Sequence, residues 1–82
     1  MIIKYFAWLK NITNTEEENV EDKNITDVKT LKEFLLKKYP MLNQYMKDDE
    51  FIGVAVNLEY VTTNEPLNSK DEIALFPPVS GG

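Results

Sequence analysis

Apolar residues occupy every second position at the start of the chain, a spacing typical of a β-strand with one buried face. In the run from Ile2 to Leu9 the odd positions are all apolar, whereas the even positions include a lysine. The odd face is therefore expected to be the buried one, and its members are Ile3, Tyr5, Ala7 and Leu9. Phe6 and Trp8 are then expected on the outer face of this strand.

A spacing of three and four residues predicts one long helix in the middle of the chain. Thr26-Asp27 offers an N-cap, and we expect the helix over residues 28–39, with Pro40 ending it. Its apolar stripe consists of Val28, Leu31, Leu35 and Tyr39, with Phe34 at the edge. A further short helical turn is expected over residues 41–47.

The second half of the chain predicts three strands. The apolar run 51–57 is the first, and a turn at 57–59 leads into residues 60–62. The last strand covers 72–76, with Ile73 and Leu75 facing inward and Phe76 outward. Earlier in the chain, the polar segment 11–24 predicts a loop that contains a short edge strand near residues 18–21.

This order of elements predicts an α+β fold, in which one main helix packs on one face of a mixed sheet. The 82 residues are enough for one domain, which we expect over residues 1–76, followed by an extended tail at 77–82. If the first and last strands are neighbours, Phe6, Trp8 and Phe76 meet on the outer face, and an exposed aromatic group of this kind favours a contact surface. The alternatives are that the helix covers this face, or that the two faces are assigned the wrong way round.

Charge and composition narrow the function classes. The net charge is −5, and it is uneven, because residues 48–82 hold one lysine against seven acids. The chain contains no arginine and no basic stripe, so nucleic acid is not an expected partner. The acidic half favours a partner with a basic surface, although an ordinary solvated acidic face explains it equally well. With no cysteine, no apolar run of membrane length and no signal peptide, we expect a cytoplasmic protein without a membrane partner.

Residues that could form a catalytic site or a metal site are nearly absent. The chain has no His and no Cys, and neither Ser69 nor Ser80 has a base beside it in the sequence. The acidic runs 16–18 and 48–50 lack the spacing of a calcium loop, and both are expected to be solvated. No metal and no tightly bound cofactor is therefore expected. The one chemically distinctive group is the α-carboxylate of Gly82.

The C-terminal sequence fits delivery of that carboxylate into another protein. Pro77 and Pro78 stop the last strand and hold the backbone extended. Gly81 and Gly82 have no Cβ, so their backbone can enter a channel too narrow for side chains. A frayed chain end is the competing explanation.

The chain resembles the MoaD family, the small sulfur-carrier subunits of molybdopterin synthase. The resemblance rests on Ala55-Val56-Asn57, on Pro66-Leu67 and above all on the run from Asp71 through Phe76-Pro77-Pro78-Val79-Ser80-Gly81-Gly82. It implies a ubiquitin-like β-grasp fold and a non-catalytic subunit with a thiocarboxylate on Gly82. It also implies activation by a MoeB-like enzyme that consumes ATP, and a heterotetramer with a MoaE-like large subunit. In that complex, sulfur would pass to precursor Z.

The same resemblance implies which residues contact partners. The positions that match the family's apolar contact surface are Phe6, Tyr60 and Phe76. The tail residues expected to enter a partner's pocket are Pro77, Pro78, Val79 and Ser80, with Gly81 and Gly82 at the reacting end. Lys70 departs from the family, which often has Gly before Asp-Glu, and a positive φ there would cost about 1 kcal/mol.

Three other interpretations stay open at this point. A thiamine-type ThiS carrier shares the fold and the diglycine, although its tails usually lack the Phe-Pro-Pro approach. A ubiquitin-like protein modifier would join Gly82 to lysines of target proteins. A plain interaction domain would keep its activity without Gly81-Gly82.

Overall fold

The computed structural model describes residues 1–46 and 52–77. In chain order the elements are β1 (Ile2–Tyr5), α1 (Leu9–Thr13), β2 (Glu17–Asn19), α2 (Val28–Lys38), the 3-10 turn η1 (Pro40–Leu42), α3 (Asn43–Met46), β3 (Gly53–Val56), β4 (Glu59–Val61) and β5 (Glu72–Phe76). The strands form one sheet in the order β2-β1-β5-β3-β4. The central pair β1–β5 is parallel, whereas the other three pairs are antiparallel. The mixed sheet packed on one main helix is therefore confirmed.

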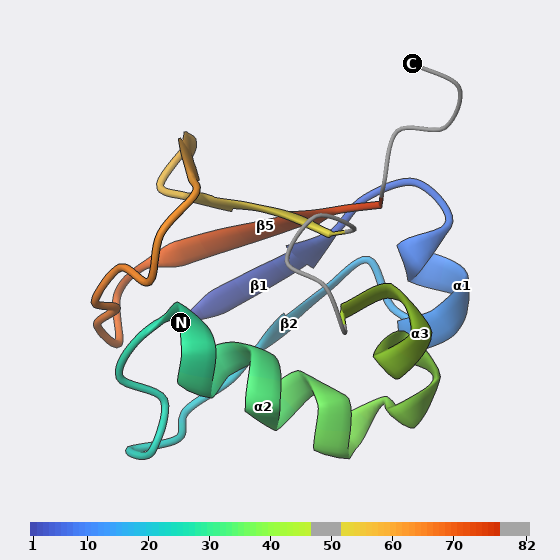
Figure 1. Cartoon of the computed structure of the whole chain (residues 1–82), viewed down its shortest axis with the longest axis horizontal. Helices are drawn as coiled ribbons and strands as arrows, with labels where there is room; N and C mark the ends of the chain where they lie inside the picture. The colour runs from blue at the N-terminus through green and yellow to red at the C-terminus, as the bar shows by residue number, and fades with distance from the viewer. Residues whose placement is uncertain (47–51, 78–82) are drawn as a thin grey trace.

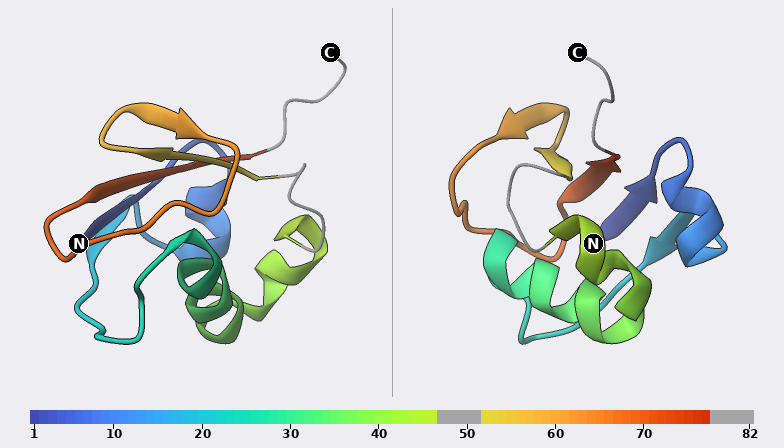
Figure 2. Two further views of the ribbon diagram at one scale, coloured as in Figure 1. Left: turned by 60° about the vertical axis from the view of Figure 1, so that its left-hand side comes forward. Right: turned by 45° about the vertical axis from the view of Figure 1, so that its right-hand side comes forward.

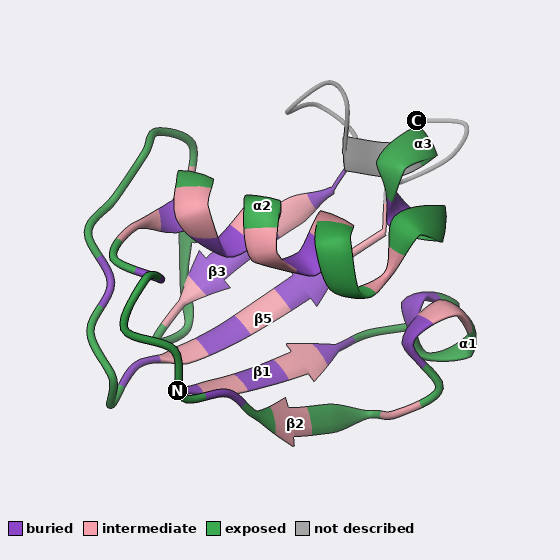
Figure 3. Ribbon diagram, turned by 90° about the horizontal axis from the view of Figure 1, so that it is seen from below, coloured by how far each residue is buried: buried purple, intermediate pink, exposed green. Residues whose placement is uncertain are grey.

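The molecule has two layers. The sheet is one layer, and α2 lies across one face of the sheet, with η1 and α3 continuing from its C-terminal end (Figures 1 and 2). Buried residues alternate along β1 and β5, and the buried residues of α2 line the side of the helix that faces the sheet (Figure 3). The side chains least exposed to solvent lie between these layers, at 0–1% exposure: Ile3, Leu9, Leu31, Leu35, Leu42, Ile73 and Leu75. The opposite face of the sheet is left uncovered by α2.

The main helix begins at the predicted residue, Val28, and ends at Lys38, one residue before the predicted end. Asp27 is the N-cap: its side chain accepts a hydrogen bond from the amide of Thr30, and the Thr30 hydroxyl accepts one from the amide of Asp27. This reciprocal capping satisfies amide groups that have no partner inside the helix. Tyr39 leaves the helical region (φ −127°, ψ 80°) because it precedes Pro40. Further helical structure after Pro40 is confirmed by η1 and α3, although Lys47 lies outside the described residues.

The first strand is shorter than the alternation predicts. It ends at Tyr5, and Ala7 turns the chain with a positive φ of 54° and an exposed side chain. Trp8 is then the N-cap of α1 rather than part of the strand's outer face. Leu9 is buried as expected, but because α1 packs it against the core. The expectation that Ala7 is buried is therefore wrong.

The polar segment after the first strand is also more structured than expected. Its first three residues belong to α1, which is closed by Asn14 as C-cap in the left-handed conformation (φ 62°). The edge strand exists as β2, which begins one residue before the expected range and ends two residues before its end. Lys70 is not among the described non-glycine residues with positive φ, which are Ala7, Asn14, Asn57 and Leu58. The departure at Lys70 therefore causes no backbone strain.

The remaining predicted strands are present as β3, β4 and β5. Ile52 and Val54 are buried and Val56 packs against the core, whereas Phe51 lies outside the described residues. Within the described part of the chain, no helix is long and apolar enough to cross a membrane.

Candidate docking surface beside the C-terminal tail

The parallel pairing of β1 with β5 brings Phe6 and Phe76 together from opposite ends of the sequence. Tyr5 pairs with Leu75, and the amide of Phe6 donates to the carbonyl of Leu75 at 3.1 Å. The rings of Phe6 and Phe76 stack, with centroids 4.8 Å apart and planes 11° apart. The expectation that these two residues are neighbours on the outer face is therefore confirmed.

Tyr60 reaches the same two rings from the edge strand β4. Its ring centroid lies 5.5 Å from that of Phe76, with the planes tilted by 34°. Alternation had not singled out Tyr60, because β4 has only three residues, and only the family resemblance pointed to it. We call Phe6, Tyr60 and Phe76 the aromatic patch. Phe6 is 42% exposed and Tyr60 71%, so apolar area remains available on the face that α2 leaves uncovered.

Small residues surround the aromatic patch on this face. Ala55 pairs with Tyr60 on one side and with Ala74 on the other, so all three lie on the uncovered face. Gly53 pairs with Phe76. The aromatic rings therefore pack on a flat part of the sheet, formed by Gly53, Ala55 and Ala74, whose side chains are absent or small. Trp8, the N-cap of α1, is 37% exposed.

The aromatic patch lies at the beginning of the expected tail. Phe76 is the last residue of β5, and the half-buried Pro77 follows it directly. Pro78, Val79, Ser80, Gly81 and Gly82 lie outside the described residues. Their roles, and the boundary between the domain and the tail, stay predictions.

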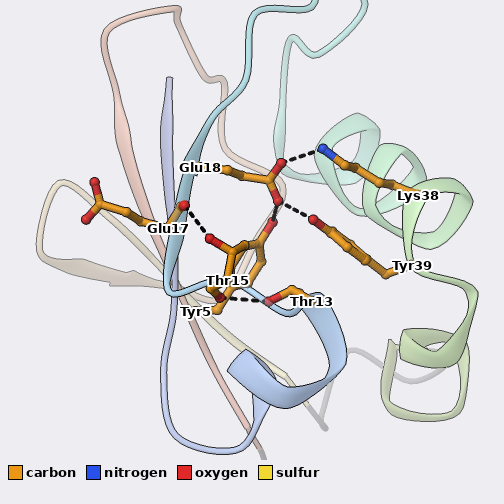
Figure 4. A network of polar contacts seen from close by, with 7 residues as sticks. All are labelled: Tyr5, Thr13, Thr15, Glu17, Glu18, Lys38 and Tyr39. Atoms are coloured by element: carbon orange, nitrogen blue, oxygen red, sulfur yellow. Dashed lines mark hydrogen bonds and ion pairs between the residues drawn. The ribbon is translucent and has the colours of Figure 1, made fainter.

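The largest ionisable cluster among the described residues lies elsewhere, between β2 and α2 (Figure 4). The carboxylate of Glu18 accepts hydrogen bonds from the hydroxyl of Tyr5 at 2.6 Å, from the hydroxyl of Tyr39 and from the ammonium of Lys38. Its side chain is 15% exposed, so the expectation that all of residues 16–18 are solvated is wrong for Glu18. Residues 48–50 lie outside the described residues.

The contacts and the pKa directions of this cluster favour a structural role. Burial alone would raise the pKa of Glu18, but the hydrogen bonds from Lys38, Tyr39 and Tyr5 outweigh it and lower the pKa. Burial, followed by the hydrogen bond to Glu18, raises the pKa of Tyr5 and of Tyr39. Both phenols therefore stay protonated at neutral pH and are not poised as nucleophiles. The described residues also contain no group of three or more acidic side chains placed to hold a metal ion.

A mixed five-stranded sheet in this order, with one main helix on one face, defines a ubiquitin-like β-grasp domain. The chain belongs to the ThiS family, which it matches over residues 3–82. It is 33% identical over 82 residues to the molybdopterin synthase sulfur carrier subunit of Caenorhabditis briggsae, covering 98% of this chain and 94% of the relative. The sulfur carrier subunit of Mycobacterium tuberculosis is also 33% identical, over 81 residues, with the same two coverages. The resemblance to the sulfur-carrier subunits of molybdopterin synthase, inferred from the sequence, is thereby confirmed.

Two solved structures extend the comparison. The small archaeal modifier protein SAMP1 of Haloferax volcanii superposes with a TM-score of 0.81 at 32% identity, covering 100% of this chain and 98% of that one. The second structure is a protein–protein complex of subunits 1 and 2 of the molybdopterin-converting factor from Helicobacter pylori. It matches with a TM-score of 0.67 at 26% identity, covering 99% of this chain and 96% of the matched chain.

Proposed function

We propose that this chain is a sulfur carrier in molybdenum cofactor biosynthesis. The observation that carries the proposal is the similarity over the whole chain to several subunits of that name. The sequence supplies the group that such a carrier needs, a C-terminal Gly81-Gly82. The lack of histidine and cysteine fits a chain that carries a reacting group while its partners supply the catalysis.

The chemistry takes place on the carboxylate of Gly82. An activating enzyme of the MoeB type transfers AMP from ATP to this carboxylate and releases pyrophosphate. Sulfide then attacks the carbonyl carbon and displaces AMP, which leaves a thiocarboxylate. This sulfur is nucleophilic, as thiolates are, and it is passed to precursor Z in the synthase. ATP is bound by the activating enzyme, and the only group that this chain carries is the sulfur on Gly82.

The aromatic patch is proposed as the surface that docks the large, MoaE-type subunit and the activating enzyme. Three observations support this role: the exposure of Phe6 and Tyr60, the uncovered face, and the position beside the start of the tail. The Helicobacter pylori structure pairs a similar chain with a second subunit. Once docked, residues 77–80 extend into the partner's pocket, and the small and large subunits assemble as a heterotetramer.

Removal of Gly82 tests the carrier mechanism. We expect the shortened chain to form no thiocarboxylate and to transfer no sulfur in an assay with the activating enzyme, ATP, sulfide, the large subunit and precursor Z. The readouts are the intact mass of the chain, which rises by one oxygen-to-sulfur exchange only with the full tail, and the formation of molybdopterin. The matched control replaces Ser80 by Ala, which keeps the tail length and the terminal glycine. Wild-type transfer by the shortened chain would contradict the mechanism.

A ubiquitin-like protein modifier is the second candidate, and the similarity to SAMP1 favours it. In that case the activated Gly82 would form an amide with a lysine of another protein. Branched Gly-Gly remnants on lysines of other proteins, found by mass spectrometry of the native cells, would support this function. A thiamine-type carrier would instead give its sulfur to thiazole formation, which cells lacking the gene would reveal as a thiamine requirement.

A further inference from the structure

Gly53 lies in a strand at a position where glycine is not needed for the backbone conformation and does not stabilise the strand. It is the first residue of β3, and its φ lies outside the left-handed region, so any L-residue could adopt its backbone conformation. Glycine weakens a strand because it has no side chain to pack and loses more entropy on folding. The reason for glycine here therefore lies in the space above its Cα.

That space is taken by the aromatic patch. Gly53 pairs with Phe76 on β5, while Tyr60 pairs with Ala55 two residues further along β3. Tyr60 and Phe76 are thus separated by one whole strand, and their rings meet only by crossing above Gly53. A Cβ on residue 53 would lie 3.3 Å from Cε1 of Tyr60 and 3.7 Å from Cβ of Phe76. A methyl group would fit only if the tyrosine ring moved by a few tenths of an ångström, and a branched side chain would occupy the place of the ring.

We propose that Gly53 is a positioning residue of the docking surface. Because residue 53 has no side chain, the ring of Tyr60 can lie across β3 and contact the ring of Phe76. The three aromatic rings then form one continuous apolar surface, shaped for an apolar face of a protein partner. Without this space Tyr60, which is already 71% exposed, would swing into solvent and the surface would lose its third ring. The inference rests on the proposed docking role of the aromatic patch.

The test replaces Gly53 by Val and measures binding to the large subunit of the synthase. We expect the affinity to fall at least tenfold, and nuclear Overhauser contacts between the rings of Tyr60 and Phe76 to disappear. The free energy of unfolding should not fall, because valine favours strands and the displaced ring is free to move outward. Gly53→Ala should give a smaller loss of affinity. The matched control is Asn19→Val, which adds the same side chain at an exposed position of β2 away from the aromatic patch.

A second comparison shows whether Gly53 acts through Tyr60. If it does, the double variant Gly53→Val/Tyr60→Ala should bind no more weakly than Tyr60→Ala alone, because the ring that the introduced valine would displace is already gone. If both Gly53 variants bind with wild-type affinity while the separate variant Phe76→Asp does not bind, the inference about Gly53 is overturned and the docking role stays intact. Wild-type affinity of Phe76→Asp would instead overturn the docking role itself.

Discussion

At the scale of single residues, the turn between β3 and β4 contains a residue, Leu58, whose type does not suit its backbone conformation. Val56 pairs with Glu59, so Asn57 and Leu58 form a two-residue turn, and both have positive φ, at 50° and 72°. This is the pattern of a type I′ hairpin turn, for which Asn-Gly is the preferred sequence. Asn57 suits its position, and its side chain donates to Asp71. Leu58 is 88% exposed and gains no packing in return for its strained backbone.

Leu58→Gly is therefore expected to stabilise the protein. Relief of the left-handed conformation should add about 1 kcal/mol to the free energy of unfolding, measured by urea denaturation at neutral pH. Leu58→Ala is the control, since it removes the same exposed apolar surface but keeps a Cβ at positive φ. Equal midpoints for the Gly and Ala variants would show that the backbone of residue 58 is not strained.

At the scale of elements, the short edge strand β2 is held by polar contacts rather than by apolar burial. Its three residues are all polar, and only Glu18 turns toward α2 (Figure 4). There it contacts Lys38 and Tyr39 near the end of the helix and Tyr5 of the neighbouring strand. One carboxylate thus links β2 to residues of β1 and of the end of α2 that lie 13 to 21 positions away from it in the sequence.

Glu18→Gln is expected to lower the free energy of unfolding by about 1.5–3 kcal/mol at neutral pH, as for hydrogen bonds to a charged group. Most of this loss belongs to the tyrosine contacts, because Lys38 is 45% exposed and its ion pair is screened. The pKa of Glu18 is lowered in the folded state, so its stabilisation is complete above the ordinary value of 4.5 and is lost as the pH falls through the folded-state pKa.

Urea denaturation from about pH 7 to about pH 2 checks this sign. The difference between wild type and Glu18→Gln should shrink as the pH falls below about 4.5. Glu17→Gln, on the same strand but exposed, should show no comparable loss at neutral pH. A difference that grows on acidification would mean that the folded state prefers the protonated carboxyl group.

At the scale of the whole molecule, folding and the proposed chemistry occupy separate parts of the chain. The buried core of the described residues runs from Met1 to Leu75. The aromatic patch lies at the edge of this core, and the group proposed to react lies at the far end of the tail. A carrier can in this way present its tail to several partners without rearranging its core.

A chain ending at Pro77 is expected to have a free energy of unfolding within about 0.5 kcal/mol of that of the full chain, because no core residue is removed. A chain ending at Leu75 provides the contrast, since it lacks Phe76 and its ring contacts with Phe6 and Tyr60, and it should be less stable. Urea denaturation of the three chains measures both differences. A large loss on removing residues 78–82 would show that the tail packs on the domain.

Features that depend on neighbours in the chain could be predicted from the amino-acid sequence. Helical spacing located α2, and Asp27 and Pro40 located its ends, because capping and proline geometry are local effects. Alternation correctly placed Ile3 and Tyr5 inside, and Ile73 and Leu75 likewise, because side chains of a strand alternate between its faces. The C-terminal motif carried the family resemblance.

Features that depend on pairing between strands distant in the sequence became visible only in the folded protein. The β1–β5 pairing stacks Phe6 on Phe76, and the β4–β3–β5 register leaves the ring of Tyr60 above Gly53. The prediction that the first strand continues past Tyr5 was wrong, because the positive φ of Ala7 belongs to a turn that the spacing of apolar residues does not indicate. The burial of Glu18 was equally hidden, because a three-residue polar strand has no apolar period and its partners lie on other elements.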